Sequence, residues 1–72
     1  MYMYLSEEEA EKIIIEFLAR KGRATTREIE EEIRKTGKRC PDESVKFLMK
    51  LRSHGRIKGE VSAEARGWVW YL

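Results

Sequence analysis

Apolar side chains near the start of the chain recur at the spacing of one helix face. The repeat consists of Ala10, Ile13, Ile14, Phe17 and Leu18. Steps of three and four residues between apolar positions are typical of an amphipathic helix. Ahead of the repeat, Ser6 and Glu9 have the spacing of a capping box. After it, Gly22 suits the left-handed residue that ends many helices. The pattern predicts a helix over residues 6–21, after an N-terminal extension over residues 1–5.

The next segment repeats this arrangement on a smaller scale. Thr25 and Glu28 form a second capping-box pattern. Ile29 and Ile33 then mark a narrow apolar stripe, which persists as a helix only when it packs against other elements. We expect a second helix over residues 26–36.

A third helix is predicted after the only proline of the chain. Pro41 fits the first position of a helix, where its missing N–H group is not needed. Phe47, Leu48 and Leu51 form an inward stripe at helical spacing. The predicted helix covers residues 41–54.

Beyond this helix the hydrophobic spacing changes to that of strands. Residues 56–61 alternate in part, and residues 68–72 are dense in aromatic and β-branched side chains, with a polar connection between them. This pattern predicts a β-hairpin over residues 56–72. One face of its second strand carries Trp68, Trp70 and Leu72. We expect this face to close the core rather than to stack on unpaired bases.

Together these elements predict an α+β fold in which three helices precede a two-stranded hairpin, in a single domain over residues 1–72. Residues 23–25 are expected to form a connector or a strand with a single bridge. A chain of this length buries one small core.

The composition argues against metal, disulfide and catalytic chemistry. The 72 residues include one cysteine, Cys40, and one histidine, His54. They therefore provide neither an internal disulfide nor the four ligands of a structural zinc site. We expect no cofactor, no bound metal and no small-molecule ligand. Because a core this small offers little concavity to tune a carboxyl group, we expect no enzymatic activity.

The sequence also predicts a cytoplasmic protein without a membrane partner. No stretch approaches the roughly 20 apolar residues of a membrane span. Residues 1–5 are apolar but have no basic leader, unlike a signal peptide. Charged residues make up 39% of the chain, and asparagine and glutamine are absent. This composition is typical of thermophiles, in which charge networks replace thermolabile amides.

Charge is distributed unequally along the chain. Through Ile33 there are nine acidic and five basic residues, a net charge of 5 − 9 = −4. From Arg34 onward there are ten basic and four acidic residues, a net charge of 10 − 4 = +6. Such asymmetry predicts that one face of the molecule meets a polyanion.

With this order of elements, the chain resembles the winged-helix family of prokaryotic and archaeal type, a variant of the helix-turn-helix. The resemblance rests on Thr-Thr-Arg-Glu-Ile at 25–29, on the spacing of Leu48, Leu51, Gly55 and Ile57, and on Trp-Val-Trp-Tyr at 68–71. It implies a third helix in the major groove of DNA and a hairpin, the wing, on the backbone or the minor groove. The implied function is that of a double-stranded DNA-binding transcriptional regulator or chromatin-associated factor.

The candidate DNA-binding residues belong to the third helix, its approach and the wing. They are Lys38, Arg39, Lys46, Lys50, Ser53, Arg56, Lys58 and Arg66. Cations that neutralise phosphates release counterions, so binding is expected to weaken steeply with salt. Because adenine readout usually uses Asn or Gln, which are absent, only a modest sequence preference is expected. Guanine readout by Lys46, Lys50 or Arg52 and sensing of minor-groove width by Arg66 stay open.

Other partners also stay open. A winged helix can serve as a protein-interaction module within a larger nucleic-acid-processing assembly, and the acidic residues 30–32 would suit a basic partner. An RNA- or ribosome-associated role is a third hypothesis. The apolar residues 1–5 either pack back on the domain or form a homodimer contact.

Overall fold

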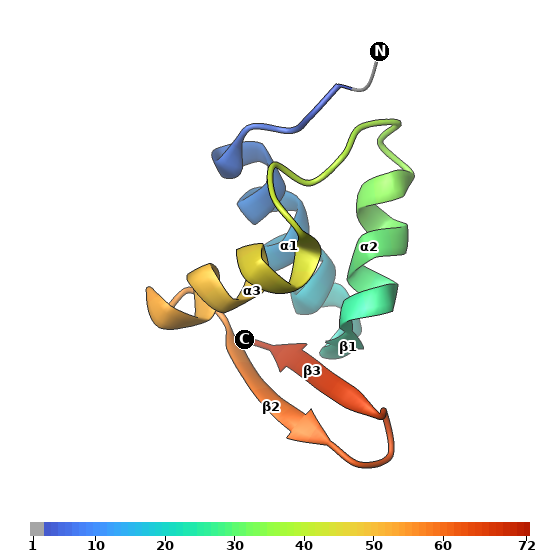
Figure 1. The fold of residues 1–72 in the computed structure, drawn as a ribbon, viewed down its shortest axis with the longest axis vertical. Helices are drawn as coiled ribbons and strands as arrows, with labels where there is room; N and C mark the ends of the chain where they lie inside the picture. The colour runs from blue at the N-terminus through green and yellow to red at the C-terminus, as the bar shows by residue number, and fades with distance from the viewer. Residues whose placement is uncertain (1–2) are drawn as a thin grey trace.

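Three helices and a three-stranded antiparallel sheet make up residues 3–72, the part of the chain that the computed structural model describes (Figure 1). In chain order the elements are α1 (Glu7–Lys21), β1 (Arg23–Thr25), α2 (Thr26–Arg34), α3 (Ser44–Ser53), β2 (Lys58–Ser62) and β3 (Gly67–Tyr71). In the view of Figure 1, α3 crosses in front of α1, and the β2–β3 hairpin extends away from the helices. The predicted α+β class is confirmed.

Both predicted capping boxes are present and begin α1 and α2. The hydroxyl of Ser6 accepts from the N–H of Glu9 at 3.1 Å, and the carboxylate of Glu9 accepts in return from the N–H of Ser6 at 3.2 Å. Thr25 and Glu28 make the same reciprocal pair at 3.2 and 3.0 Å. Each pair satisfies a backbone donor that the first turn of a helix leaves without an intrahelical partner.

The sheet contains a third strand that the hairpin prediction lacked. Its strand order is β1-β3-β2, with β3 in the centre. Ala24 of β1 lies opposite Trp70, and Gly59 of β2 lies opposite the same residue on the other side. Residues 23–25 thus form a full three-residue pairing rather than a connector, since this register places the buried Ala24 beside the buried Trp70.

Trp70 is the centre of the core. Its side chain is 0% exposed, and its indole N–H donates to the hydroxyl of Thr26 at 2.9 Å. The rest of the core cluster consists of Leu5, Ala10, Ile14, Leu18, Ala24, Ile29, Ile33, Phe47, Leu48, Leu51 and Ile57. Of the three residues expected to close the core, Trp70 does so fully and Trp68 in part. Leu72 is 48% exposed, because β3 ends at Tyr71 and leaves Leu72 unpaired.

Two helices are shorter than predicted. α2 ends at Arg34 rather than at residue 36, because the Thr36 hydroxyl donates to the carbonyl of Ile33 at 2.7 Å and the chain turns at Gly37. α3 begins at Ser44 rather than at Pro41. Arg39 pairs with Tyr4 of the N-terminal segment, and the chain bends at residues 41 and 42 before the helix begins.

That N-terminal segment packs back on the domain over the residues described. The backbone N–H of Leu5 donates to the carbonyl of Arg39 at 2.7 Å, and the N–H of Arg39 donates to the carbonyl of Met3 at 2.9 Å. The side chain of Leu5 lies in the core. The first two residues of the predicted extension lie outside the described range. No helix within residues 3–72 has the length and apolar character that crossing a membrane requires.

Candidate nucleic-acid interface

The outer surface of α3 carries three of the predicted DNA-binding residues, Lys46, Lys50 and Ser53, and all three are exposed. Lys50 is not free, since its ammonium group lies 2.6 Å from the carboxylate of Glu7 in the first turn of α1. Lys46 makes a looser contact of 3.9 Å with Glu43. One flank of α3 is therefore already neutralised by carboxylates of the same chain.

The two predicted cations at the start of the wing, Arg56 and Lys58, lie in different places. The Nε atom of Arg56 lies 3.8 Å from the carboxylate of Glu11 in α1, so this cation also contacts an acidic side chain. Lys58 is paired across the sheet with Tyr71, the residue after the buried Trp70. Because successive side chains of a strand alternate between faces, Lys58 lies on the sheet face opposite to Trp70. Lys58 therefore does not share a surface with α3, whereas Arg56 and Lys50 contact Glu11 and Glu7, which lie one turn apart on the same face of α1.

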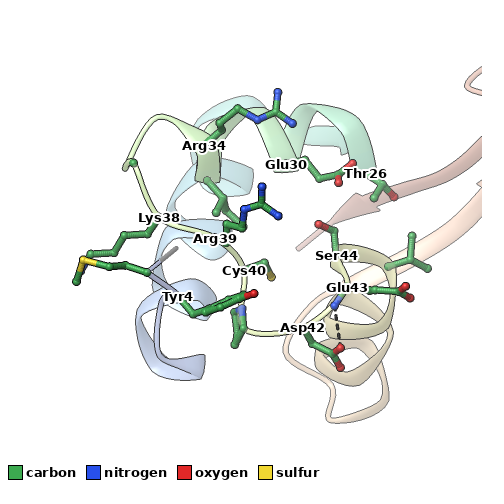
Figure 2. Close-up of a pocket in the computed structure, with 15 residues that line it drawn as sticks. Tyr4, Thr26, Glu30, Arg34, Lys38, Arg39, Cys40, Asp42, Glu43 and Ser44 are labelled. Atoms are coloured by element: carbon green, nitrogen blue, oxygen red, sulfur yellow. Dashed lines mark hydrogen bonds between the residues drawn. The ribbon is translucent and has the colours of Figure 1, made fainter. Parts of the chain in front are cut away.

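Lys38 and Arg39 lie in the loop between α2 and α3, where they border an open hollow (Figure 2). Figure 2 shows the side chain of Arg39 pointing into this hollow, between Glu30 of α2 and Tyr4 of the N-terminal segment. The hollow is lined by both signs of charge, with Arg34 near the two cations and Asp42 and Glu43 on the side of α3. A lining of mixed charge does not favour the binding of a polyanion.

Arg66 occupies the turn of the hairpin and lines a second hollow. Arg27 of α2, Val45 of α3 and Trp68 of β3 line the same hollow. Both arginines are exposed, and no ion pair among residues 3–72 involves either of them. Here cations from the beginning of α2 and from the hairpin turn border one concave surface.

Arg52 of α3 approaches this surface from the other end of the helix. Its Nε–H donates to the carbonyl of Gly59 in β2 at 3.1 Å, and its guanidinium carbon lies 5.4 Å from the centre of the Trp68 ring. The side chain is exposed. Arg27 and Arg66 thus line the second hollow, and Arg52 lies over the Trp68 ring that lines it too. We call this hollow together with Arg52 the valley between α3 and the hairpin.

The structure therefore divides the eight predicted residues among separate places. Lys46, Lys50 and Ser53 share the exposed side of α3, and Arg66 lies at the hairpin turn. Lys38 and Arg39 border the first hollow, Arg56 faces α1, and Lys58 lies on the far face of the sheet. A single continuous cationic surface made of all eight does not form.

Of the valley arginines, Arg66 was a predicted DNA-binding residue and Arg52 was left open as a guanine reader, whereas Arg27 was not predicted. Arg27 stands in the first turn of α2, where the positive end of the helix dipole disfavours a cation. That misplacement is a sequence signal that could have identified it. Arg52 was not among the eight predicted DNA-binding residues, because a basic residue in the last turn of a helix is favourable and common and does not by itself mark a site.

Cys40 and the acidic residues offer no second site. Cys40 is half-buried, and this burial raises the pKa of its thiol above the ordinary value, so the thiol resists ionisation. Across the described 70 residues, 3–72, no group of three or more His, Cys, Asp or Glu side chains is placed to hold a metal ion.

Comparison with protein-family models, with curated proteins and with solved structures found no match to this chain.

Proposed function

We propose that this chain is a winged-helix module that binds double-stranded DNA through α3 and the β2–β3 hairpin and catalyses no reaction. In this role it acts as a small transcriptional regulator or chromatin-associated protein. The order of its elements, three helices and then a hairpin packed beside the third, supports the family resemblance of the sequence.

The observation that carries the proposal is that Arg27 of α2 and Arg66 of the hairpin turn line one hollow with Trp68, and that Arg52 of α3 lies over the ring of Trp68. None of the ion pairs within residues 3–72 uses these three side chains, so their charge is available to an outside anion. The surface between them is apolar at Val45 and Trp68. Arginines around an apolar surface suit a phosphodiester chain, which presents charged phosphates and apolar sugar faces.

This arrangement shifts the proposed interface away from the flank of α3 on which Lys50 lies. DNA would meet the flank that faces the hairpin, because Glu7 already neutralises Lys50. The exposed Ser53 lies on the outer side of α3, whereas Lys46, which contacts Glu43 at 3.9 Å, lies on the same flank as Lys50.

The test is the salt dependence of duplex binding. We expect the wild type to bind duplex DNA with a steep dependence of affinity on salt. The variant Arg27→Gln/Arg66→Gln should bind more weakly, with a log–log slope reduced by about 1.8, at about 0.9 per phosphate contact.

A matched control is Lys12→Gln/Lys35→Gln, which changes the net charge equally. Lys12 lies exposed on α1, and Lys35 contacts Glu32 at the far end of α2. This control should keep the wild-type slope. An equal loss in both double variants would show that only overall charge matters and would contradict the proposed interface.

A protein-docking role is the alternative, and the same experiment separates it from DNA binding. Of the acidic residues of α2, Glu32 already contacts Arg20 at 3.0 Å and Lys35 at 3.2 Å, which leaves less free charge for a basic partner. A docking module would bind any duplex weakly, and Arg27→Gln/Arg66→Gln would not change that binding. An RNA-binding protein would prefer a single-stranded or A-form competitor over the B-form duplex.

A further inference from the structure

Arg52 is an exposed side chain that is held in place from two sides. Its Nε–H donates to the carbonyl of Gly59 at 3.1 Å, which ties α3 to the neighbouring strand β2. Its guanidinium lies over the ring of Trp68, with 5.4 Å between the guanidinium carbon and the ring centre. An exposed arginine ordinarily samples many rotamers, so this double contact restricts it in the unbound protein.

The support beneath Arg52 continues into the core. The ring of Trp68 stacks on that of Trp70, with centres 5.2 Å apart and an angle of 16° between the planes. Trp70 is fully buried and donates to Thr26. The Trp70 ring also requires glycine at position 59, since a β-carbon there would overlap the ring. The guanidinium therefore rests on a stack anchored in the middle of the protein.

The contacts of Arg52 leave most of its donors unused. A guanidinium carries five N–H donors, of which the one on Nε is engaged with Gly59. No other hydrogen bond or ion pair within residues 3–72 uses the four donors on the two Nη atoms. This pair of nitrogens forms a fork whose spacing matches two oxygens of one phosphate.

We propose that Arg52 binds the DNA phosphodiester strand that runs between the groove occupied by α3 and the groove faced by the hairpin, an inference that rests on the proposed function. Adjacent grooves of duplex DNA are separated by a sugar–phosphate strand. A protein with a helix in one groove and a hairpin at the next must straddle that strand. Arg52 lies where the two elements meet, because it extends from α3 and is bonded to β2.

The ligand of Arg52 is a phosphate rather than a base edge. Because its Nε–H is bonded to the backbone of β2, the guanidinium stays at the junction of helix and hairpin and does not extend from the outermost side of α3. A phosphate lies at this junction whatever the base sequence. Arg52 therefore contributes affinity equally to all duplexes.

The test compares Arg52→Gln with the wild type on two duplexes of unrelated sequence over a range of salt concentrations. We expect Arg52→Gln to lose about tenfold in affinity on both duplexes and to lower the log–log slope by about 0.9. Lys12→Gln, which makes the same change in net charge on α1, should retain the wild-type affinity and slope. Urea unfolding of each variant reports whether the fold is intact.

Two further variants keep the proposal testable if Arg52→Gln fails to fold. Arg52→Lys retains the charge but loses the fork, so the slope should stay while affinity falls severalfold. Trp68→Leu removes the ring beneath the guanidinium, and its affinity should fall in the same way with the slope kept.

Three outcomes would overturn the inference. Wild-type affinity and slope in Arg52→Gln would make Arg52 only a link between α3 and β2. A loss confined to one of the two duplexes would make it a base-reading residue. These first two outcomes leave the proposed function intact. The third outcome is that the wild type shows no salt-dependent duplex binding, which would contradict both the proposed function and this inference.

Discussion

At the scale of single residues, Arg66 has a backbone conformation that its side chain does not favour. Its φ of 56° lies in the left-handed region, and within residues 3–72 the other residues with positive φ are glycines. A residue with a β-carbon pays roughly 1–2 kcal/mol in this region. The turn between β2 and β3 would be more stable with glycine, so we infer that an arginine stands there for the sake of its charge.

We therefore expect Arg66→Gly to raise stability while it weakens DNA binding. Relief of the backbone strain exceeds the entropy that glycine adds to the unfolded chain, which leaves a net gain of roughly 0.5–1 kcal/mol. Urea unfolding and duplex titration measure the two effects. Arg66→Ala serves as the control, since it should weaken binding equally without the gain in stability. A less stable Arg66→Gly would contradict this interpretation of the turn.

At the scale of elements, the sheet depends on the close approach of β2 to Trp70. Gly59 of β2 has no room for a side chain beside that ring, whereas a β-carbon on Gly67 of β3 would have no neighbour within 4 Å. Both glycines lie in strands and neither has a positive φ. The two positions therefore form a matched pair.

Gly59→Ala should destabilise the protein by about 1–3 kcal/mol, because it forces an extra methyl group into a filled core. Gly67→Ala should be neutral or slightly stabilising, since it only reduces the freedom of the unfolded chain. Midpoints of urea unfolding measure both. Equal effects of the two substitutions would show that the Trp70 ring shifts to accommodate the added methyl group and that the sheet is loosely packed.

The capping boxes and interhelical ion pairs give the helices a dependence on acid. The contact with Lys21, followed by the backbone bond at Thr25, holds the pKa of Glu28 below its ordinary value of 4.5. The contact with Arg20 and then that with Lys35 lower the pKa of Glu32, and the N–H of Ser6 lowers that of Glu9. A lowered pKa in the folded state means that the folded protein prefers the charged carboxylate.

The resulting stability is present above about pH 4.5 and is lost as pH falls through the lowered folded pKa values. We expect urea midpoints that are constant near neutral pH and decline in this acidic range. Glu28→Gln keeps a capping side chain but removes the charge, so it should lower the midpoint at pH 7 and flatten the acid decline. Glu31→Gln, at an exposed position without an ion pair in the described part of the chain, should leave the curve unchanged.

At the scale of the whole molecule, the acidic first part of the chain folds against the basic second part. Lys50 contacts Glu7 and Arg56 contacts Glu11, so α1 neutralises cations that follow it by more than 40 residues. The charge difference between the two halves of the sequence is therefore partly cancelled in space. The three arginines between α3 and the hairpin are among the cations that no ion pair within residues 3–72 involves.

Removal of the carboxylate at Glu7 should release Lys50 to the DNA. We expect Glu7→Gln to raise duplex affinity severalfold and to increase the salt slope by up to about 0.9. Glu8→Gln changes the net charge equally, but no ion pair within residues 3–72 involves this neighbour, so it should have a smaller effect. If both variants gain equally, Glu7 acts only through the general field of the protein.

Much of this architecture was predictable, because its signals are local. Both capping boxes join residues three positions apart, and the apolar stripes of the helices follow from the period of a single helix. The hairpin followed from a change in that period. These interactions are encoded within a few residues of one another, so the order of side chains along the chain is sufficient to predict them.

What the sequence by itself determined was the set of elements, their caps and the excess of cations in the second half. The tertiary structure alone decided which of those cations are free. Lys50 meets Glu7 across 43 positions and Arg23 meets Glu60 across 37, and β1 joins β3 across a similar span. Such contacts depend on how the helices and the sheet pack around Trp70, and no local spacing encodes them. For that reason the interface that we propose rests on arginines from α2, α3 and the hairpin turn, whereas the sequence alone pointed first to the lysines of α3.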